Sequence, residues 1–89
     1  MARTDKEICL ILHNLRSAQN VGALFRVADA VGVAKIYLTG YTPTPFDRFG
    51  RPNKEVIKTA LGAENYVEWE AYKTINSLLK KLVASSFQL

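Results

Sequence analysis

The residues best suited to chemistry in this sequence are polar side chains gathered in one short stretch near the N-terminus. They are two amides and two guanidinium groups: Asn14, Arg16, Asn20 and Arg26. A guanidinium group carries a positive charge and only donates hydrogen bonds, whereas an amide both donates and accepts them. Groups of these types bind anions such as phosphate. The stretch therefore indicates an anion-binding site.

Other common kinds of site find no support in the sequence. His13 has no second His, Cys or carboxylate at the spacing of metal ligands, and the same isolation argues against a Ser–His–Asp or Cys–His nucleophile. Cys9, the one cysteine, excludes an intramolecular disulfide and falls inside an apolar run, where a thiol is usually inert. Without a G-x-G-x-x-G motif or a P-loop, a dinucleotide or nucleoside-triphosphate site has no support either.

A predicted strand, helix and second strand position these polar residues. Ile8–Leu12 is continuously apolar and too short for a helix, which is typical of a buried strand. Apolar residues recur at helical spacing over residues 21–31, with Asn20 as the expected N-cap and Gly32 as the residue that closes the helix. Val33–Leu38 is rich in residues that favour strands. The two strands are therefore expected to be parallel, with a right-handed crossover.

Ligands of an open parallel sheet bind outside the carboxyl ends of its strands. Here that edge is formed by His13–Ser17 after the first strand and by Thr39–Pro45 after the second. The predicted helix begins at the same edge, where its free N–H groups and positive dipole end attract an anion. An extended Arg26 side chain leans toward the start of the helix and covers most of the ~9 Å back to it. The four polar residues can thus converge on one edge.

Simpler roles for the same residues stay open at this point. Arg26 can pair with Asp29 as an exposed helix arginine, Asn20 can act only as a cap, and Asn14 can act only as a turn former. Packing on the sheet is favoured over stacking on nucleic-acid bases for three aromatic residues further along the chain, Tyr66, Trp69 and Tyr72.

The rest of the chain continues the alternation of strands and helices. Thr39–Pro52 contains three prolines and two glycines, and a connection of that length is usually functional or mobile. A helix is predicted over Lys54–Leu61, capped by Asn53 and ended by Gly62. Tyr66–Glu70 alternates apolar and charged residues, as a half-exposed edge strand does. In the last predicted helix, an apolar face opposes two lysines: Ile75, Leu78, Leu79 and Leu82 against Lys80 and Lys81.

Composition and charge restrict the class of protein. The 89 residues are 48% hydrophobic and 22% charged, as in a small globular domain or part of one. The net charge is +4, and residues 1–58 hold nine Lys and Arg against five Asp and Glu. Such a basic excess suits a phosphate-rich partner. The longest apolar run has five residues, too short to span a membrane or to form a signal-peptide core, so we expect a cytoplasmic protein without membrane association.

The stretch Leu12–Val33 closely resembles the first motif of the SpoU (TrmH-like) RNA 2′-O-ribose methyltransferases, which belong to the SPOUT superfamily. The similarity continues through Ile36–Pro43 and Lys58–Glu64, and the Asn-x-Gly-x-x-x-Arg pattern is specific in that context. The resemblance implies an α/β fold, with a Rossmann-like parallel sheet flanked by helices. It also implies a homodimer with a deep trefoil knot at the C-terminal side of the domain. The implied activity is methyl transfer from S-adenosylmethionine to a ribose 2′-hydroxyl of tRNA or rRNA.

The resemblance also assigns expected roles to residues. The family's arginine that is proposed to activate the 2′-hydroxyl falls on Arg26, and the asparagine that shapes the catalytic pocket falls on Asn20. Since a guanidinium is a poor base, we expect Arg26 to orient and polarise the hydroxyl rather than to remove its proton. The expected RNA-binding residues comprise the segment before Asn20 and the basic positions further on: Asn14, Arg16, Ser17, Arg48, Arg51 and Lys54.

The sequence departs from the family pattern in one large respect. The second and third family motifs, which contain Gly-Glu and Ser-Leu-Asn and which form the knot and most of the cofactor pocket, are not found in residues 1–89. The apolar and polar alternation that begins at Phe87 also stops after three residues. We therefore expect residues 1–89 to be the N-terminal half of a SPOUT domain, truncated before its knot, inactive alone and without tight binding of S-adenosylmethionine. The alternative is a non-catalytic half domain that binds RNA or a partner.

Overall fold

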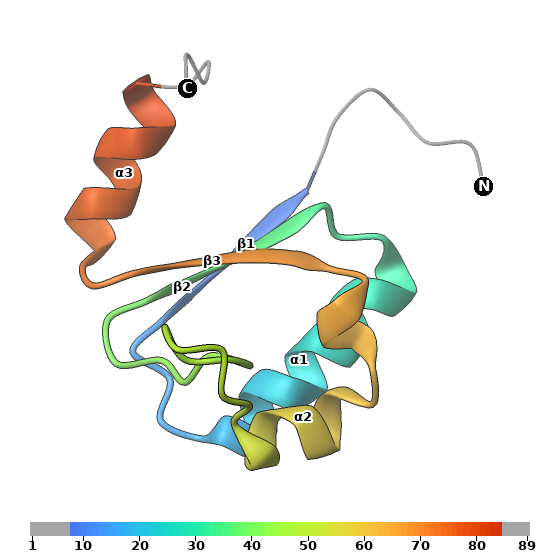
Figure 1. Cartoon of the computed structure of the whole chain (residues 1–89). Coiled ribbons are helices and arrows are strands. Elements are labelled where there is room, and N and C mark those ends of the chain that lie inside the picture. The colour runs from blue at the N-terminus through green and yellow to red at the C-terminus, as the bar shows by residue number, and fades with distance from the viewer. Residues whose placement is uncertain (1–7, 85–89) are drawn as a thin grey trace.

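The computed structural model describes residues 8–84 of the 89. Strands and helices alternate along this part of the chain (Figure 1). In order they are β1 (Cys9–His13), α1 (Ala18–Val31), β2 (Lys35–Thr39), α2 (Lys54–Ala60), the 3₁₀ turn η1 (Ala63–Asn65), β3 (Glu68–Tyr72) and α3 (Ile75–Ala84). No helix within residues 8–84 is long and apolar enough to cross a membrane.

The three described strands form one parallel sheet in the order β1-β2-β3. Leu10 and Leu12 of β1 lie beside Ile36 and Leu38 of β2 in register. The predicted parallel pairing of the first two strands is therefore confirmed, as is the α/β class. The predicted edge strand is also confirmed, although β3 begins two residues later than the pattern suggested, at Glu68.

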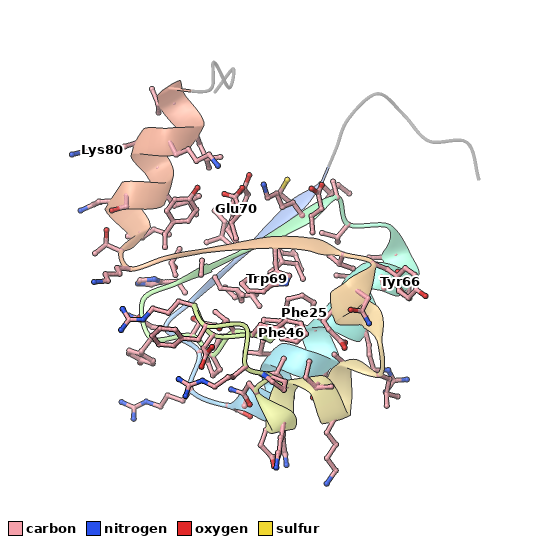
Figure 2. The ribbon with its side chains drawn as sticks, in the orientation of Figure 1. Phe25, Phe46, Tyr66, Trp69, Glu70 and Lys80 are labelled. Carbon is pink, nitrogen blue, oxygen red and sulfur yellow. The ribbon has the colours of Figure 1, made fainter. Side chains whose placement is uncertain are left out.

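Helices cover both faces of the sheet (Figure 1), with α1 and α2 on one side and α3 on the other. The main core lies between the sheet and α1 and α2. Its members are fully or almost fully buried apolar side chains, among them Leu12, Val21, Phe25, Ile36, Leu38 and Val56. Phe46 and Trp69 lie on the same side of the sheet as Phe25, whereas Glu70 lies on the other side (Figure 2). Packing on the sheet is confirmed for Trp69, which contacts the core, but Tyr66 is 79% exposed, so the packing prediction is wrong there.

Gly22 lets α1 and α2 approach one another closely. A Cβ atom at this position would lie 1.9 Å from Thr59 Oγ1 and 2.4 Å from the carbonyl oxygen of Val56. Real Cβ atoms do not approach other heavy atoms this closely, so any side chain at position 22 must push the two helices apart. The glycine of the Asn-x-Gly-x-x-x-Arg pattern thus has a packing reason in this structure.

The cap of α1 differs from the prediction. Ser17 is the N-cap, with an extended backbone and an Oγ that accepts the N–H of Asn20 at 3.1 Å, so Asn20 lies inside the first turn. The helix begins earlier than the apolar spacing suggested because Ala18, a strong helix former, extends it by a turn toward the N-terminus. At the other end Gly32 closes the helix as predicted, with φ 82° and its N–H bonded to Ala28 O at 3.0 Å.

The second helix follows its predicted cap but ends differently. Asn53 Oδ1 accepts the N–H groups of Glu55 and Val56, which confirms the predicted cap. The C-cap is Leu61, which adopts the left-handed conformation at φ 52°, rather than Gly62 as predicted. Gly62 continues in the same conformation, at φ 89°, and leads into η1.

Two predictions about burial are wrong. The first strand was expected to be buried, but β1 is an edge strand of the described sheet, with Cys9 exposed and Ile11 42% exposed. This difference arises because α1 and α2 cover only the opposite face of β1, whereas α3 contacts β2 and β3. In α3 itself, Leu78 is fully buried as expected, but Leu79 is 47% exposed. Lys81, assigned to the solvent face, points to the sheet.

Candidate functional site

The carboxyl ends of β1 and β2 are joined by the side chain of Asn14. This residue adopts the left-handed conformation at φ 56°, and its N–H donates to Thr39 O at 3.2 Å. Its Oδ1 accepts the N–H of Tyr41 at 3.2 Å, while its Nδ2 donates to His13 Nε2 at 3.2 Å. A Cβ at Gly40 would lie 1.8 Å from Asn14 Oδ1, so the close approach requires glycine there. Asn14 is therefore more than a turn former, because it fixes the start of the loop after β2.

The hydrogen bonds also determine the tautomer of His13. Because Asn14 Oδ1 accepts a backbone N–H, its Nδ2 must be the donor to His13 Nε2. The proton of the ring then lies on Nδ1, which donates to Thr39 Oγ1 at 2.8 Å. Thr39 is fully buried, and its hydroxyl lies 3.5 Å from Leu12 O. His13 thus helps to hold the edge of the sheet.

A second buried threonine joins the segment before α1 to the same loop. Thr42 Oγ1 accepts the N–H of Leu15 at 3.1 Å and lies 3.0 Å from Leu12 O and 2.8 Å from Thr39 O. Next to Leu15, the guanidinium of Arg16 lies 5.4 Å from the centre of the Tyr41 ring. The structure therefore brings Asn14 and Arg16 to one edge together with the loop, as the sequence predicted.

The loop between β2 and α2 is held in shape by its own hydrogen bonds. Phe46 and Pro52 pair as an isolated antiparallel bridge. Asp47 Oδ1 accepts the N–H groups of Phe49 at 2.8 Å and Arg51 at 2.9 Å, and Asp47 Oδ2 accepts Arg51 Nε at 2.8 Å. The hydrogen bond from the Arg51 backbone, followed by that from its side chain, lowers the pKa of Asp47. The tip of this connection is thus an ordered turn.

The basic residues of the loop gather around an exposed ring. The guanidinium groups of Arg48 and Arg51 lie 5.0 Å and 5.1 Å from the centre of the Phe49 ring. Phe49 is 68% exposed. Lys54, the first residue of α2, is also exposed and completes the basic positions of this segment.

Arg26 and Asn20 both lie on the exposed surface of α1. Arg26 lines an open hollow in that surface together with Ala23, Val27 and Ala30. Within residues 8–84, the structure records no ion pair between Arg26 and Asp29, and neither the Arg26 nor the Asn20 side chain forms a hydrogen bond. No hydrogen bond joins Arg26 to the edge occupied by Asn14 and Arg16. Of the four residues predicted to converge on this edge, the structure therefore brings Asn14 and Arg16 together there.

Comparison with known proteins shows which family this chain belongs to. The model of the SpoU rRNA Methylase family matches residues 7–89. The chain belongs to this family. Among solved structures it is similar to the SpoU methyltransferase AviRb from Streptomyces viridochromogenes, with a TM-score of 0.73 and 15% sequence identity over 88% of this chain. The chain spans 28% of the length of AviRb. A search of curated proteins finds no match.

The hollow beside Arg26 in this SpoU chain does not fit S-adenosylmethionine. An adenosyl sulfonium compound needs acceptors for its adenine amine and a polar surface for its amino-acid end. The walls of the hollow are Ala23, Val27 and Ala30, so Arg26 is its one polar lining side chain. A cation beside a sulfonium is unfavourable as well. The described lining of the hollow therefore lacks the acceptors that the cofactor needs.

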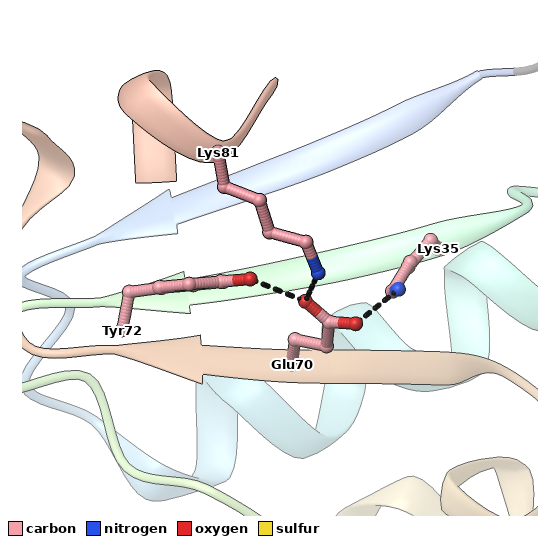
Figure 3. A network of polar contacts seen from close by, with 4 residues as sticks. All are labelled: Lys35, Glu70, Tyr72 and Lys81. Carbon is pink, nitrogen blue, oxygen red and sulfur yellow. Dashed lines mark hydrogen bonds and ion pairs between the residues drawn. The ribbon is translucent and has the colours of Figure 1, made fainter. Parts of the chain in front are cut away.

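A network of charged groups fixes α3 of the SpoU chain to the sheet (Figure 3). Glu70 Oε2 lies 2.6 Å from Lys35 Nζ, and its Oε1 accepts hydrogen bonds from Lys81 Nζ at 2.7 Å and Tyr72 Oη at 2.6 Å. The hydrogen bond from Lys35, followed by those from Lys81 and Tyr72, lowers the pKa of Glu70 to about 2. The hydrogen bond with Glu70 in turn raises the pKa of Lys81 and of Lys35. The network lies on the opposite side of the sheet from α1.

The sequence reasoning did not identify two aromatic residues of the site. Tyr41 and Phe49 are 58% and 68% exposed, and each contacts at least one guanidinium. A signal was present in the sequence, since Phe49 stands between Arg48 and Arg51 in a segment rich in turn residues.

Proposed function

We propose that this SpoU-family chain takes part in methyl transfer from S-adenosylmethionine to a ribose 2′-hydroxyl of tRNA or rRNA. The observation that carries the proposal is the position of Arg26. It is an exposed guanidinium in a hollow with apolar walls, without an ionic partner among residues 8–84, and it stands at the arginine of the Asn-x-Gly-x-x-x-Arg pattern.

The role that we assign to Arg26 is to orient and polarise the hydroxyl. Its planar fork of N–H groups can donate to the 2′ oxygen and to an adjacent phosphate oxygen at the same time. The alanine and valine walls exclude water when a ligand covers the hollow, which strengthens these hydrogen bonds. Asn20, in the first turn of the same helix, is proposed to shape the pocket from the side of the helix start.

Binding of RNA is assigned to the carboxyl edge of the sheet and the loop after β2. The proposed contacts are groups that donate to phosphate or carry positive charge, namely Asn14, Arg16, Ser17, Arg48, Arg51 and Lys54. Among these, Asn14 and Ser17 already use side-chain oxygens within the protein, so they shape the surface more than they bind. The four cations supply the attraction to phosphate.

A homodimer is the proposed assembly, and the outer face of α1 supports it. Val27 and Val31 are 55% and 64% exposed on this face, next to the hollow that holds Arg26. Two exposed valines beside alanines form an apolar surface that a second copy of the helix can cover. With tRNA or rRNA as substrate, the place of action is expected to be the cytoplasm.

A second candidate is a non-catalytic domain that binds RNA without methyl transfer. The observation that favours it is that the Gly-Glu and Ser-Leu-Asn motifs of the family are not found in residues 1–89. We expect the 89 residues alone to bind S-adenosylmethionine weakly or not at all, with cofactor binding by the remainder of a complete SPOUT domain. Calorimetric titration of the chain with S-adenosylmethionine tests this expectation, and micromolar binding would contradict it.

The two candidates are separated by single-turnover methylation of RNA with labelled S-adenosylmethionine. The assay uses the 89-residue chain and, if the reading frame continues past Leu89 into Gly-Glu and Ser-Leu-Asn segments, the longer protein. For the longer protein we expect labelled methyl groups on ribose. Arg26→Ala is expected to abolish this labelling, and Asp29→Ala, an exposed change on the same helix, is expected to leave it unchanged. RNA binding without methyl transfer by the longer protein would establish the second candidate instead.

A further inference from the structure

Two exposed aromatic rings lie in the loop after β2, and each is accompanied by guanidinium groups. Tyr41 is 58% exposed with Arg16 at 5.4 Å from its ring centre. Phe49 is 68% exposed with Arg48 and Arg51 at 5.0 Å and 5.1 Å. Large aromatic side chains usually bury most of their surface. Rings that stay exposed beside cations therefore call for a ligand with both aromatic and anionic parts.

The backbone under both rings is held in place before any ligand binds. The N–H of Tyr41 donates to Asn14 Oδ1 at 3.2 Å, which fixes the start of the loop to the end of β1. The tip is fixed by Asp47, whose carboxylate accepts the N–H of Phe49 at 2.8 Å, the backbone N–H of Arg51 at 2.9 Å and the Nε of Arg51 at 2.8 Å. Further back, the N–H of Asn53 donates to Pro45 O at 2.8 Å. The backbone that carries the rings thus has little conformational entropy left to lose on binding.

Charge identifies the kind of ligand. Around Phe49 the segment carries Arg48, Arg51 and Lys54 against Asp47, and within residues 8–84 Arg48 has no ion pair. An apolar protein partner would meet isolated rings surrounded by cations rather than a continuous apolar patch. A nucleotide offers a flat base for the ring and a phosphate for the guanidinium.

We infer that Tyr41 and Phe49 stack on unpaired bases of single-stranded RNA while Arg16, Arg48 and Arg51 contact the neighbouring phosphates. The inference rests on the proposed function in taking RNA as the ligand, and it adds that the bound segment is unpaired. A base inside a duplex has both faces covered by its neighbours, so it cannot stack on a side chain. Two rings on one loop therefore select a loop, bulge or end of an RNA over a helix.

The test compares binding of a single-stranded oligonucleotide that contains 2-aminopurine with binding of a duplex of the same length. The full chain is compared with Tyr41→Leu and Phe49→Leu, which keep apolar bulk but remove the aromatic face. Stacking on a ring is worth about 5- to 150-fold in affinity, so each leucine variant is expected to bind the single strand more weakly by a factor in this range. Duplex binding is expected to stay within about twofold, and quenching of 2-aminopurine is expected to decrease.

Two further variants serve as matched controls. Tyr66→Leu removes an aromatic ring that is 79% exposed but has no guanidinium of residues 8–84 beside it, and it is expected to leave binding unchanged. Phe49→Trp enlarges the stacking surface and is expected to keep or increase affinity for the single strand. Circular dichroism of every variant checks that the fold is retained.

The inference is overturned if Tyr41→Leu and Phe49→Leu bind the single strand as well as the unchanged chain does. It is also overturned if they weaken single strand and duplex equally, or if the unchanged chain binds neither, which would leave a protein contact as the role of the rings. A different result would overturn the proposed function and leave this inference intact. Selective loss of single-strand binding in the leucine variants, together with no methyl transfer by the longer protein, would leave the stacking site in place and remove the activity.

Discussion

Replacement of Gly22 by alanine tests the packing on which the site depends. The new Cβ would lie 1.9 Å from Thr59 Oγ1, 2.4 Å from Val56 O and 2.9 Å from Ala60 N. Two of these three atoms belong to the backbone of α2, which cannot turn away as a side chain can. Relief therefore requires that α1 and α2 separate by about 1 Å, since ordinary contacts of a buried carbon begin near 3.5 Å.

The expected loss of stability follows from two opposing contributions. Overpacking of this kind costs about 1–3 kcal/mol, and the upper end applies because backbone atoms are involved. Alanine is better than glycine inside a helix by about 1 kcal/mol, which acts in the other direction. The net free energy of unfolding should decrease by about 2 kcal/mol, and the melting temperature of a domain of this size should decrease by about 8–16 °C.

Thermal and urea unfolding followed by circular dichroism measure this change. In the double variant Gly22→Ala, Thr59→Ala the hydroxyl contact is removed and the carbonyl contact of Val56 remains, so only part of the loss should be recovered. Ala23→Gly, an exposed change at the next position, is the control for helix propensity and should cost about 1 kcal/mol without any clash. A Gly22→Ala chain that melts at the same or a higher temperature would show that the helices tolerate the methyl group and would refute the reasoning.

Three other changes have expected outcomes. In a SpoU protein that continues from residues 1–89 into Gly-Glu and Ser-Leu-Asn segments, Arg26→Ala should lower kcat by at least about 100-fold with an unchanged melting temperature. Arg26→Lys should rescue poorly because an ammonium lacks the planar fork, and near-normal turnover of Arg26→Ala would reduce Arg26 to an exposed helix arginine. The affinity of the chain for RNA should fall as salt rises, and Arg48→Ala should reduce the salt slope by about one, which filter binding at several salt concentrations measures. Because its partners lower the pKa of Glu70 from 4.5 to about 2, the stability it contributes should be present above pH 4.5 and be lost as the pH falls toward 2. Glu70→Gln should remove that part of the pH dependence in urea unfolding, and an identical acid profile would contradict the network.

Short-range rules were sufficient to predict the strand, helix and strand that carry the first motif. Gly32 and Asn53 end and begin helices as predicted, because left-handed closure and capping depend only on residues within one turn. The pairing of β1 with β2 in parallel also follows from a local fact, the presence of a helix between them. Where two good caps compete, local rules do not decide, and Ser17 rather than Asn20 begins α1.

Contacts between distant residues account for what the sequence could not predict. Lys81 was assigned to the solvent face because helical periodicity counts any lysine as polar, yet Glu70 on β3 offers it a carboxylate at 2.7 Å. The exposure of β1 depends on where α3 lies, and no spacing within β1 reports that position. The contacts of Asn14 with Tyr41 and His13 likewise depend on the register of two strands. A single sequence contains no direct record of such pairs.

These contacts give a structural reason for the spacing between the glycine and the arginine of the SpoU pattern. Gly22 lies one helical turn before Arg26, on the side of α1 that faces α2. Because α1 is seated directly against the backbone of Val56 and Ala60, its rotation and distance from α2 are fixed at that turn. The direction in which Arg26 leaves the next turn is then fixed as well. A bulkier residue at position 22 would therefore be expected to disturb methyl transfer through the placement of Arg26 even where the chain still folds, with kcat reduced more than affinity for RNA.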